Sequence, residues 1–372
     1  MKARGPAAGL DVDRRTVLAW GGALGLAALT ACSSPENPIA SATPTPASTS
    51  PSPSLTIKAS GLDTPWSMVR RRDGSFLISE RDTARIMSLS LDGRLTPLAH
   101  LPQVVPGGEA GLLGLEIFGE SASTEWLYAY MSTREDNRVV RFELLDSRLG
   151  PAQDVLTGIP RAGIHNGGRI KFGPDGLLYI GTGDATDRQA AQDPARLNGK
   201  VLRIQPEGGI PMDNPFAGSP VYSYGHRNVQ GLGWDATRRL WISELGPEKN
   251  DEVNLVRAGG NYGWPQVTGV ANDPGFVDPI HVWAKTSEAS PSALAIAGDT
   301  AYVACLRGER LWVLHLPQGT PPAGGALPGA RELLTGQQGR LRDALVVGRE
   351  LWVATNEGAD SRIIALSLTS ED

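Results

Sequence analysis

The feature that most constrains the fold of this chain is a pattern of short apolar strands and turns that recurs six times after residue 54. In each copy an apolar strand is followed by a turn, a second apolar strand and, further on, a run of alternating apolar residues. The copies begin at WSMVRRRDGS, LLGLEIFGES, GGRIKFGPDG, VQGLGWDATR, SALAIAGDTA and DALVVGRELW. Their spacing of roughly 45 to 60 residues is typical of small antiparallel sheets that bury their faces by stacking around a common axis.

The turns between the first two strands of a copy support this interpretation. Asp73-Gly74, Asp175-Gly176 and Gly298-Asp299 are residue pairs that tolerate the backbone angles of tight hairpins. The sequence therefore predicts an all-β fold, a six-bladed β-propeller with four-stranded antiparallel blades, over residues 55–372. A solenoid or a sandwich also uses short strands, but neither predicts six diverged copies of one unit of three to four strands.

The first 54 residues have a different character. Arg14 and Arg15 precede the apolar run TVLAWGGALGLAAL, which is too short to span a bilayer and has the proportions of a signal peptide. The run ends in LTAC, which resembles a lipoprotein cleavage site, and the paired arginines resemble a twin-arginine export signal. We therefore expect residues 1–32 to be a signal peptide that leaves Cys32 lipidated. The alternative is an ordinary secretory signal with an incidental cysteine.

Residues 33–54 are dominated by Ser, Thr, Pro and Ala, a composition that buries too little apolar surface to fold and predicts a disordered linker. Together these segments predict an exported protein, periplasmic or lipid-anchored to the outer face of the bacterial cell membrane. If Cys32 carries lipid, Cys305 has no disulfide partner, since the chain holds two cysteines.

The charge of the chain argues against nucleic acid as a partner. The formal net charge is −5, from 35 basic and 40 acidic residues, and no block of like charge interrupts the mixture. With no large apolar surface segment in the sequence, a monomer is slightly favoured.

In a propeller the innermost strand of each blade lines the central channel, so the residues that precede or begin these strands converge at one mouth. From the six copies these residues are Pro65, Trp66, Glu109, His165, Asn166, His226, Arg227, Asn228, Ser290, Ser292, Arg340 and Arg342. The next connection of a blade returns to the same face and adds Asp184, the segment Glu244 to Pro247, and Arg307. Several arginines beside one histidine predict an anion site with a potential base.

On these residues the chain resembles the aldose sugar dehydrogenases of the glucose/sorbosone dehydrogenase family, which use pyrroloquinoline quinone (PQQ). The matching segments are GLDTPWSM, HNGGRIKFGPDGLLYIGTGD, LNGKVLRI, YGHRNVQGL, ELGPEKNDEVNLVRAGGNYGWP and RLRD, dispersed over residues 55 to 360. The resemblance implies oxidation of the C1 hydroxyl of an aldose to a lactone, with hydride transfer to PQQ and delivery of electrons to an external acceptor.

The resemblance also implies roles for individual residues. His165 matches the catalytic base, a role that histidine fills more often than any other residue type. Asp184 matches the acid that orients this base, although on its own Asp184 also fits a hairpin turn. Arg227 and Asn228 match residues beside the quinone oxygens. Arg340 and Arg342 match a pair that holds the carboxylates and ring face of the cofactor, the alternative being a salt bridge with Asp343.

Calcium is the second cofactor that the resemblance implies. Gly246 and Pro247 match the residues whose carbonyls bind the Ca²⁺ that polarises the quinone, and carbonyl oxygens suit this hard cation. Glu252 and Tyr262 match a second Ca²⁺ site, although Glu252 also fits an exposed acid at a strand end.

Two cofactor-binding positions depart from the family pattern. Glu109 stands where glutamine is usual, which puts an acid toward an anionic cofactor. Either Glu109 is protonated or bonded to a donor, or the cofactor site is altered. Arg307 stands where lysine is usual, which keeps the charge but changes the geometry.

Two other functions remain open at this point. A calcium-dependent lactonase or esterase is also built on six-bladed propellers, but it needs carboxylates and asparagines in the central channel that the mouth residues supply in too small a number. A non-catalytic sugar-binding propeller is the other alternative, because fold alone does not determine function. The preferred sugar and the physiological electron acceptor are left open.

Overall fold

The computed structural model describes residues 54–119, 124–319 and 324–368. The predicted signal peptide with Cys32, and the predicted linker up to residue 53, lie outside the described residues. From Ser52 onward the chain forms one compact unit. Among the described residues, no helix has the length and apolar character needed to cross a membrane.

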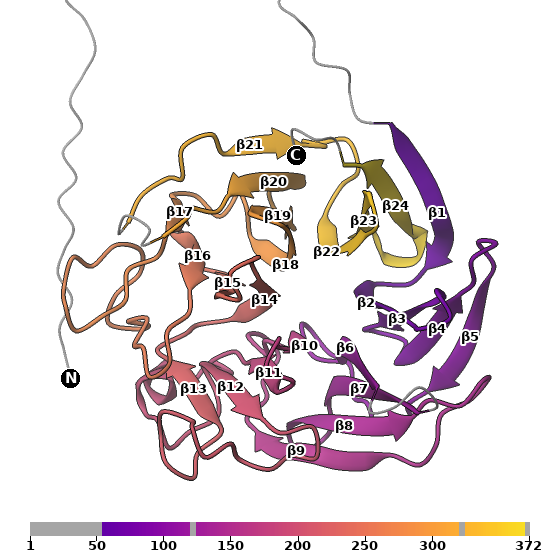
Figure 1. The fold of residues 1–372 in the computed structure, drawn as a ribbon, viewed down its shortest axis with the longest axis horizontal. Coiled ribbons are helices and arrows are strands. Elements are labelled where there is room, and N and C mark those ends of the chain that lie inside the picture. Colours follow the sequence, from indigo (N-terminus) through magenta and orange to yellow (C-terminus); the bar gives the residue numbers. More distant parts are fainter. Residues whose placement is uncertain (1–53, 120–123, 320–323, 369–372) are drawn as a thin grey trace, which may run out of the picture. The chain divides into compact units, whose positions relative to one another are not determined.

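Six four-stranded antiparallel sheets radiate from a central axis in the described part of the chain (Figure 1), which confirms the predicted six-bladed propeller. The first three blades are β2–β5 (Pro65–Arg70, Phe76–Glu80, Arg85–Leu89, Leu95–His100), β6–β9 (Leu112–Gly119, Glu125–Ser132, Asn137–Glu143, Gln153–Ile159) and β10–β13 (Ile170–Phe172, Leu178–Gly181, Lys200–Ile204, Val221–Tyr224). The next two are β14–β17 (Val229–Trp234, Leu240–Glu244, Asp251–Leu255, His281–Trp283) and β18–β21 (Pro291–Ala297, Thr300–Cys305, Arg310–His315, Arg331–Leu333). Two short 3₁₀ helices, η1 (Arg188–Gln192) and η2 (Gly358–Asp360), complete the described elements.

The sixth blade closes the ring with strands from both ends of the propeller. It contains β22 (Leu341–Val347), β23 (Glu350–Thr355) and β24 (Ser361–Ser367), and its outer strand is β1 (Leu55–Leu62). The pairing of β1 with β24 is antiparallel and runs from Leu55 opposite Leu366 to Leu62 opposite Ser361 (Figure 1). The sixth sequence copy supplies three strands, and this pairing supplies the fourth.

The hydrophobic core consists of apolar layers between neighbouring blades. Six clusters of buried side chains follow the ring. Each joins residues of two adjacent blades, and the cluster between the second and third blades also includes Trp66 of the first. Strand β19 shows why: Tyr302 and Ala304 pack toward the sixth blade, whereas Ala301 and Val303 pack toward the fourth. Strands that are apolar on both faces are expected where sheets stack face to face.

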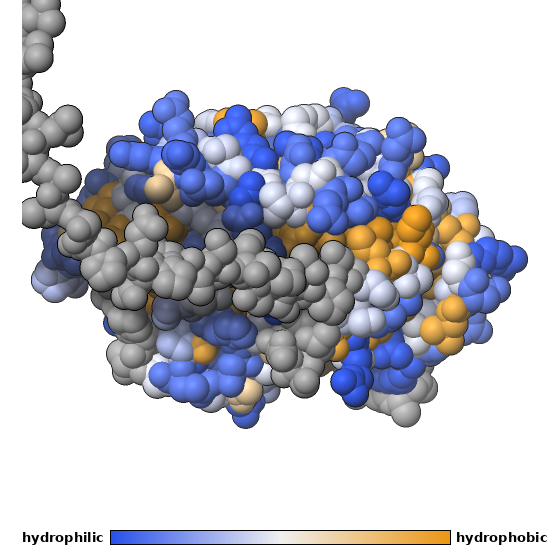
Figure 2. All heavy atoms as spheres, turned by 90° about the horizontal axis from the view of Figure 1, so that it is seen from above, coloured by the Kyte–Doolittle hydropathy of each residue, from blue (hydrophilic) through white to orange (hydrophobic). Residues whose placement is uncertain are grey.

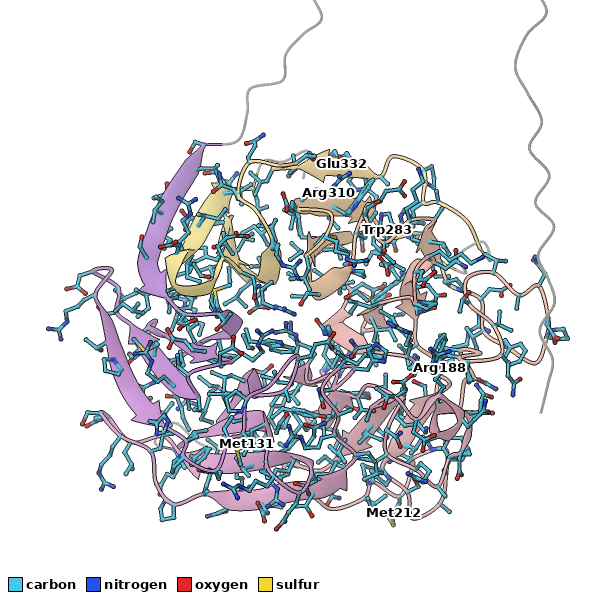
Figure 3. All side chains as sticks on the ribbon, turned by 180° about the vertical axis from the view of Figure 1, so that it is seen from behind. Met131, Arg188, Met212, Trp283, Arg310 and Glu332 are labelled. Carbon is cyan, nitrogen blue, oxygen red and sulfur yellow. The ribbon has the colours of Figure 1, made fainter. Side chains whose placement is uncertain are left out.

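The surface of the ring is mixed in character. The side seen in Figure 2 combines hydrophilic residues with separate apolar areas. Large hydrophobic side chains that are exposed in the described residues are Leu55, Ile57, Leu91, Ile164, Met212 and Val270. Seen from behind the view of Figure 1, Arg310 of β20 and Glu332 of β21 form an ion pair across two outer strands, 2.8 Å from nitrogen to oxygen (Figure 3).

All six innermost strands meet at the central axis. A cavity of about 240 Å³ is lined by residues of β2, β6, β10, β14, β18 and β22 or by residues directly beside these strands. Arg169 crosses this region, with its Nη1 atom 2.9 Å from Oδ1 of Asp343 and its guanidinium 4.3 Å from the ring centre of Trp66.

Candidate active site

His165 lies in the connection that leads into the innermost strand of the third blade, and its backbone is held in an unusual conformation. It adopts a left-handed φ of 59°, and Gly167 and Gly168 continue with φ of 62° and 111°. A Cβ atom on Gly183 would lie 1.9 Å from the carbonyl oxygen of His165, so the chain at this point requires glycine. The two glycines at positions 167 and 168 and the GTGD segment therefore allow two backbone segments to lie close together.

Asp184 is the hydrogen-bond partner of His165. Its Oδ1 atom lies 2.8 Å from Nδ1 of His165, and it also accepts from the backbone N–H of Thr186, while its Oδ2 accepts from the indole of Trp264 at 2.9 Å. The side chain is fully buried. Burial pushes the pKa of Asp184 upward, but the hydrogen bonds and the charge interaction with His165 outweigh it and hold the pKa below its usual value.

This arrangement fixes the protonation pattern of the imidazole. Because an ionised carboxylate accepts but does not donate, the proton of a neutral His165 belongs on Nδ1 and the lone pair on Nε2. The structure agrees, since Nη2 of Arg227, which can only donate, lies 2.8 Å from Nε2. His165 thus has the form of a general base held by an orienting acid.

Arg227 connects His165 to the fourth blade. Its Nη1 donates to the carbonyl of Leu245 at 3.0 Å, its backbone N–H donates to Glu244, and its guanidinium lies 5.5 Å from the ring centre of Trp264. Burial lowers the pKa of Arg227, and the neighbouring carboxylates of Asp184 and Glu244 offset this in part. Its Nε atom is buried and has no hydrogen-bond partner among the described residues.

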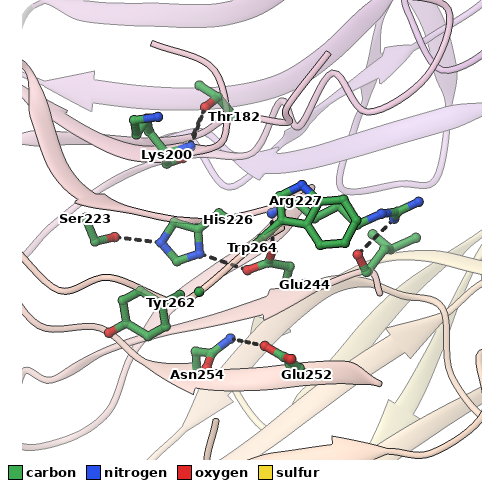
Figure 4. A network of polar contacts seen from close by, with 12 residues as sticks. Thr182, Lys200, Ser223, His226, Arg227, Glu244, Glu252, Asn254, Tyr262 and Trp264 are labelled. Carbon is green, nitrogen blue, oxygen red and sulfur yellow. Dashed lines mark hydrogen bonds and ion pairs between the residues drawn. The ribbon is translucent and has the colours of Figure 1, made fainter. Parts of the chain in front are cut away.

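A second imidazole, His226, contacts the same carboxylate, Glu244, as the backbone N–H of Arg227. Its Nδ1 lies 2.8 Å from Oε2 of Glu244, its Nε2 lies 2.8 Å from the hydroxyl of Ser223, and its ring stacks on Tyr262 with centroids 4.6 Å apart (Figure 4). Both ring nitrogens are engaged and the side chain is fully buried. His226 therefore has a structural role at this site.

Glu109 and Asn228, both predicted to bind cofactor, hold the loop of His165. The Oε2 atom of Glu109 accepts from the backbone N–H of His165 at 2.8 Å and from Nδ2 of Asn228 at 3.2 Å. Asn228 in turn accepts from the N–H of Gly167 at 2.9 Å. Of the two states expected for Glu109, the structure shows the one bonded to donors.

Arginines gather on the other side of the mouth. Arg342 is buried, and its Nη1 donates to Gln230 at 2.9 Å and to Ser292 at 3.3 Å. Burial lowers the pKa of Arg342 to about 9, with Arg81 and Arg340 adding like charge and Glu109 opposing it. Asp343 pairs with Arg169 and so does not neutralise Arg340 or Arg342.

This excess of positive charge fits a polycarboxylate such as the expected quinone, because buried guanidinium groups without carboxylate partners are stabilised by an anionic ligand. Arg307 extends the positive region from the fifth blade. Its Nη1 donates to Thr286 at 3.2 Å, and it lies within electrostatic range of Asp251, as Arg227 does.

The predicted calcium residues Gly246, Pro247, Glu252 and Tyr262 all line one small pocket beside Arg227, with a volume of about 10 Å³. Asp251 holds this turn by accepting from the N–H of Gly246 at 2.8 Å and from the N–H of Ser290 at 2.7 Å. Within the described residues, no hydrogen bond ends on the carbonyl oxygens of Gly246 or Pro247. These oxygens are therefore free for a cation.

The acids near this pocket also suit a cation. Burial, together with the charge of Glu244, raises the pKa of Glu252 above its usual value. The amide of Asn254 donates to Glu252, and the Oδ1 atom of Asn254 is buried with no hydrogen-bond partner among the described residues. The described residues contain no group of three or more His, Cys, Asp or Glu side chains that could hold a metal. A cation here would therefore depend on carbonyl oxygens, which Ca²⁺ accepts. Tyr262 could contribute only its carbonyl, since its hydroxyl donates to Leu255 and accepts from Arg257.

Sequence reasoning missed two residues that touch the expected base and its partners. Trp264 reaches Asp184 from a loop after β16, and Glu244, noted as part of a mouth segment, holds both His226 and Arg227. The sequence offered a signal for Trp264 in the GGNYGWP segment, but without the loop conformation nothing directed this indole toward Asp184.

Comparison with known proteins adds the following findings. Residues 62–365 match the Glucose / Sorbosone dehydrogenase family model. The PQQ-bound aldose sugar dehydrogenase of Streptomyces coelicolor is 43% identical with a TM-score of 0.79, and the match covers 84% of this chain and 98% of that one. Aldose sugar dehydrogenase YliI of Escherichia coli is 34% identical, covering 59% of this chain and 63% of that protein. Quinoprotein glucose dehydrogenase B of Acinetobacter calcoaceticus is 30% identical, covering 58% and 53%. The chain thus aligns with about half to two thirds of the length of these two curated relatives.

Proposed function

Because the chain belongs to the glucose/sorbosone dehydrogenase family, we propose that it is a PQQ-dependent dehydrogenase that oxidises the C1 hydroxyl of aldose sugars to lactones. The observation that carries this proposal is the imidazole of His165, whose Nε2 lone pair is directed by Asp184 into a mouth with unneutralised arginines. The relationship to a PQQ-bound aldose sugar dehydrogenase at 43% identity supports the choice of cofactor.

In this proposal His165 removes the proton of the C1 hydroxyl at Nε2. Asp184 stabilises the imidazolium that results, because its carboxylate already accepts the Nδ1 proton at 2.8 Å. Arg227 occupies the Nε2 lone pair in this structure, so it must yield that position to the sugar hydroxyl. Once displaced, its guanidinium offers donors to negative charge that develops during oxidation. When bound, the quinone supplies the acceptor for the hydride that leaves C1.

The two cofactors would be held by different groups of residues around this imidazole. Arg342, Arg340 and Arg307 would bind the carboxylates of the quinone, and Asn228 would lie beside its oxygens. The carbonyls of Gly246 and Pro247 would bind Ca²⁺, which acts as a Lewis acid toward a bound quinone. Glu252 and the carbonyl of Tyr262 would contribute to a second calcium site.

Reconstitution of the purified protein tests this function. Sugar-dependent dye reduction should require both PQQ and Ca²⁺ and should disappear in His165→Gln, which retains a side chain of similar polarity without a base. Arg340→Ala should instead weaken cofactor loading, measured by titrating the apoprotein with PQQ. Lactone hydrolysis without quinone would favour the hydrolase, and sugar binding without either activity would favour a binding module.

For the cellular location, the proposal follows the first 32 residues of the sequence. Export and lipid attachment at Cys32 would place the propeller outside the cytoplasmic membrane, where the electron acceptor would collect electrons from the reduced cofactor.

A further inference from the structure

Lys200 is a fully buried lysine at the first position of β12, and its ammonium group has an unusual set of partners. The Nζ atom donates to the carbonyls of Ala190 at 2.7 Å, Ala191 at 3.1 Å and Asn198 at 2.7 Å. An ammonium group has three donors, so these three carbonyls satisfy it completely. None of the ion pairs among the described residues includes Lys200, and its nearest opposite charges, Asp187 and Asp193, act only at longer range.

A buried ammonium group at this position is unfavourable for the stability of the fold. Burial lowers the pKa of Lys200 to about 7, with Asp193 and Asp187 opposing the shift and Arg196 adding to it. An apolar side chain of the same length would avoid the desolvation of the charge. The benefit of the lysine must therefore lie in what its three hydrogen bonds hold in place.

They hold the loop of residues 185–199, which begins directly after Asp184 and contains η1. The ammonium joins the end of η1, through Ala190 and Ala191, to Asn198 at the far end of the loop. The same far end is fastened to the active site, since Nδ2 of Asn198 donates to the carbonyl of Asp184 at 2.8 Å.

The loop also reaches the other partner of Asp184. Gln192, the last residue of η1, donates to the carbonyl of Trp264 at 2.6 Å and exchanges two hydrogen bonds with Asn261. Trp264 donates its indole N–H to Asp184. Two routes, through Asn198 and through Trp264, thus connect the ammonium of Lys200 with the carboxylate that orients His165.

A third connection runs to the segment that carries Arg227. The carbonyl of Ala191 accepts from the N–H of Gly225 at 2.8 Å as well as from Lys200, and the N–H of His226 donates to the carbonyl of Gly199 at 3.1 Å. Figure 4 shows Lys200, with the hydrogen bond from its backbone N–H to Thr182, in the same view as His226, Arg227 and Trp264.

We propose that Lys200 is a positioning residue for the reaction. Its ammonium fixes the 185–199 loop so that Asp184 and Trp264 hold the imidazole of His165 with its proton on Nδ1 and its lone pair on Nε2. The role in turnover rests on the proposed function, whereas the structural coupling stands on the contacts above.

The test compares the full-length apoprotein with Lys200→Met, which keeps the length of the side chain and removes its donors. The loop contains two exposed trypsin sites, Arg188 (Figure 3) and Arg196, and Arg238 on the β14–β15 hairpin serves as an internal reference. At pH 6.5, where the ammonium form prevails, cleavage after Arg188 and Arg196 should become at least about tenfold faster in the variant, relative to cleavage after Arg238. The control Lys58→Met, on the outer strand of the sixth blade, should leave this ratio unchanged.

Two further measurements separate positioning from folding. In the apoprotein, the imidazole N–H resonance of His165, assigned by its loss in His165→Gln, should broaden or shift upfield in Lys200→Met as the bond to Asp184 loosens. In the reconstituted enzyme, kcat should fall at least about tenfold while PQQ affinity and the KM for the sugar stay within twofold.

If Lys200→Met does not fold, Lys200→Gln, which retains two donors without the charge, takes its place in all three measurements. Unchanged cleavage ratios and an unchanged His165 resonance would overturn the proposal, even if the variant melted at a lower temperature. Because both apoprotein measurements need no quinone, absence of sugar oxidation in the wild-type protein would refute the proposed function without deciding the role of Lys200.

Discussion

Replacement of Asp184 by asparagine should abolish most turnover while leaving the fold and the cofactor site intact. The carboxylate accepts from three donors, namely Nδ1 of His165, the N–H of Thr186 and the indole of Trp264. An amide of the same shape offers one oxygen and one NH₂ group. If its oxygen remains toward His165, the NH₂ group faces the indole N–H, and a buried donor is left unsatisfied at about 1–3 kcal/mol.

The opposite orientation of the amide has a direct chemical consequence. The NH₂ group then faces Nδ1 of His165, which must accept, so the imidazole proton moves to Nε2 and the base loses its lone pair. Loss of the orienting carboxylate in comparable triads lowers kcat by about 10⁴, and we expect a fall of about 10³ to 10⁴, equivalent to about 4–5.5 kcal/mol in the barrier.

The assay is dye reduction by protein reconstituted with PQQ and Ca²⁺, together with a titration of PQQ affinity. Asp299→Asn serves as the control, since Asp299 is an exposed aspartate in the turn between β18 and β19, away from His165 and from the 185–199 loop. It should retain full kcat. A kcat within tenfold of wild type in Asp184→Asn, with the cofactor fully loaded, would refute the assignment of Nε2 of His165 as the base.

Four further outcomes are expected. Glu109→Gln should bind PQQ roughly three- to tenfold more tightly in an absorbance titration, because the amide still accepts from His165 while a negative charge leaves the mouth; weaker binding would contradict the electrostatic argument. The difference in unfolding free energy between wild type and Lys200→Met, measured in urea, should rise with pH between 7 and 10, since the folded pKa of about 7 lies below the ordinary lysine value of 10.5 and the folded state releases its proton first; the slope of this difference should not exceed about 1.4 kcal/mol per pH unit, and a flat or falling difference would count against a depressed pKa. Ca²⁺ should raise the melting temperature of the apoprotein, and Glu252→Gln should reduce this rise more than Glu248→Gln, which changes an exposed acid in the connection before β16; equal effects would place the cation elsewhere. Cys32→Ser should move the protein from the membrane fraction to the soluble fraction of the producing cells, and continued sedimentation with membranes would exclude lipid attachment at Cys32.

The repeated part of the fold could be predicted because each blade carries its own information. The Asp-Gly turns and the apolar strands on both sides of them specify a hairpin locally, and six such units leave few architectures other than a ring. Radial symmetry then placed His165, Arg227, Asn228 and Arg342 at one mouth, and the structure brings these residues together.

The parts that do not repeat could not be predicted in the same way. The pairing of β1 with β24 joins segments about 300 positions apart, and nothing in LTIKASGL specifies its partner. Trp264 and Gln192 act through loops whose conformations depend on hydrogen bonds to each other and to Lys200, so spacing along the chain gives no measure of their proximity. For Glu109, the sequence predicted only a charge that faces an anion site. The observed position of its carboxylate depends on the left-handed backbone of His165, whose N–H donates to Glu109.

The pairing of β1 with β24 also sets the order in which this protein can mature. A ribosome must synthesise Ser361–Ser367 before the sixth blade can receive its outer strand, so the groups around His165 and those around Arg342 become neighbours only near the end of translation. A nascent chain that lacks this last strand has the strands of five blades and two strands of the sixth, but β1 has no partner and the ring is not closed. Competence to bind a ligand between the groups around His165 and those around Arg342 is therefore a late event, reached in the same step that closes the ring.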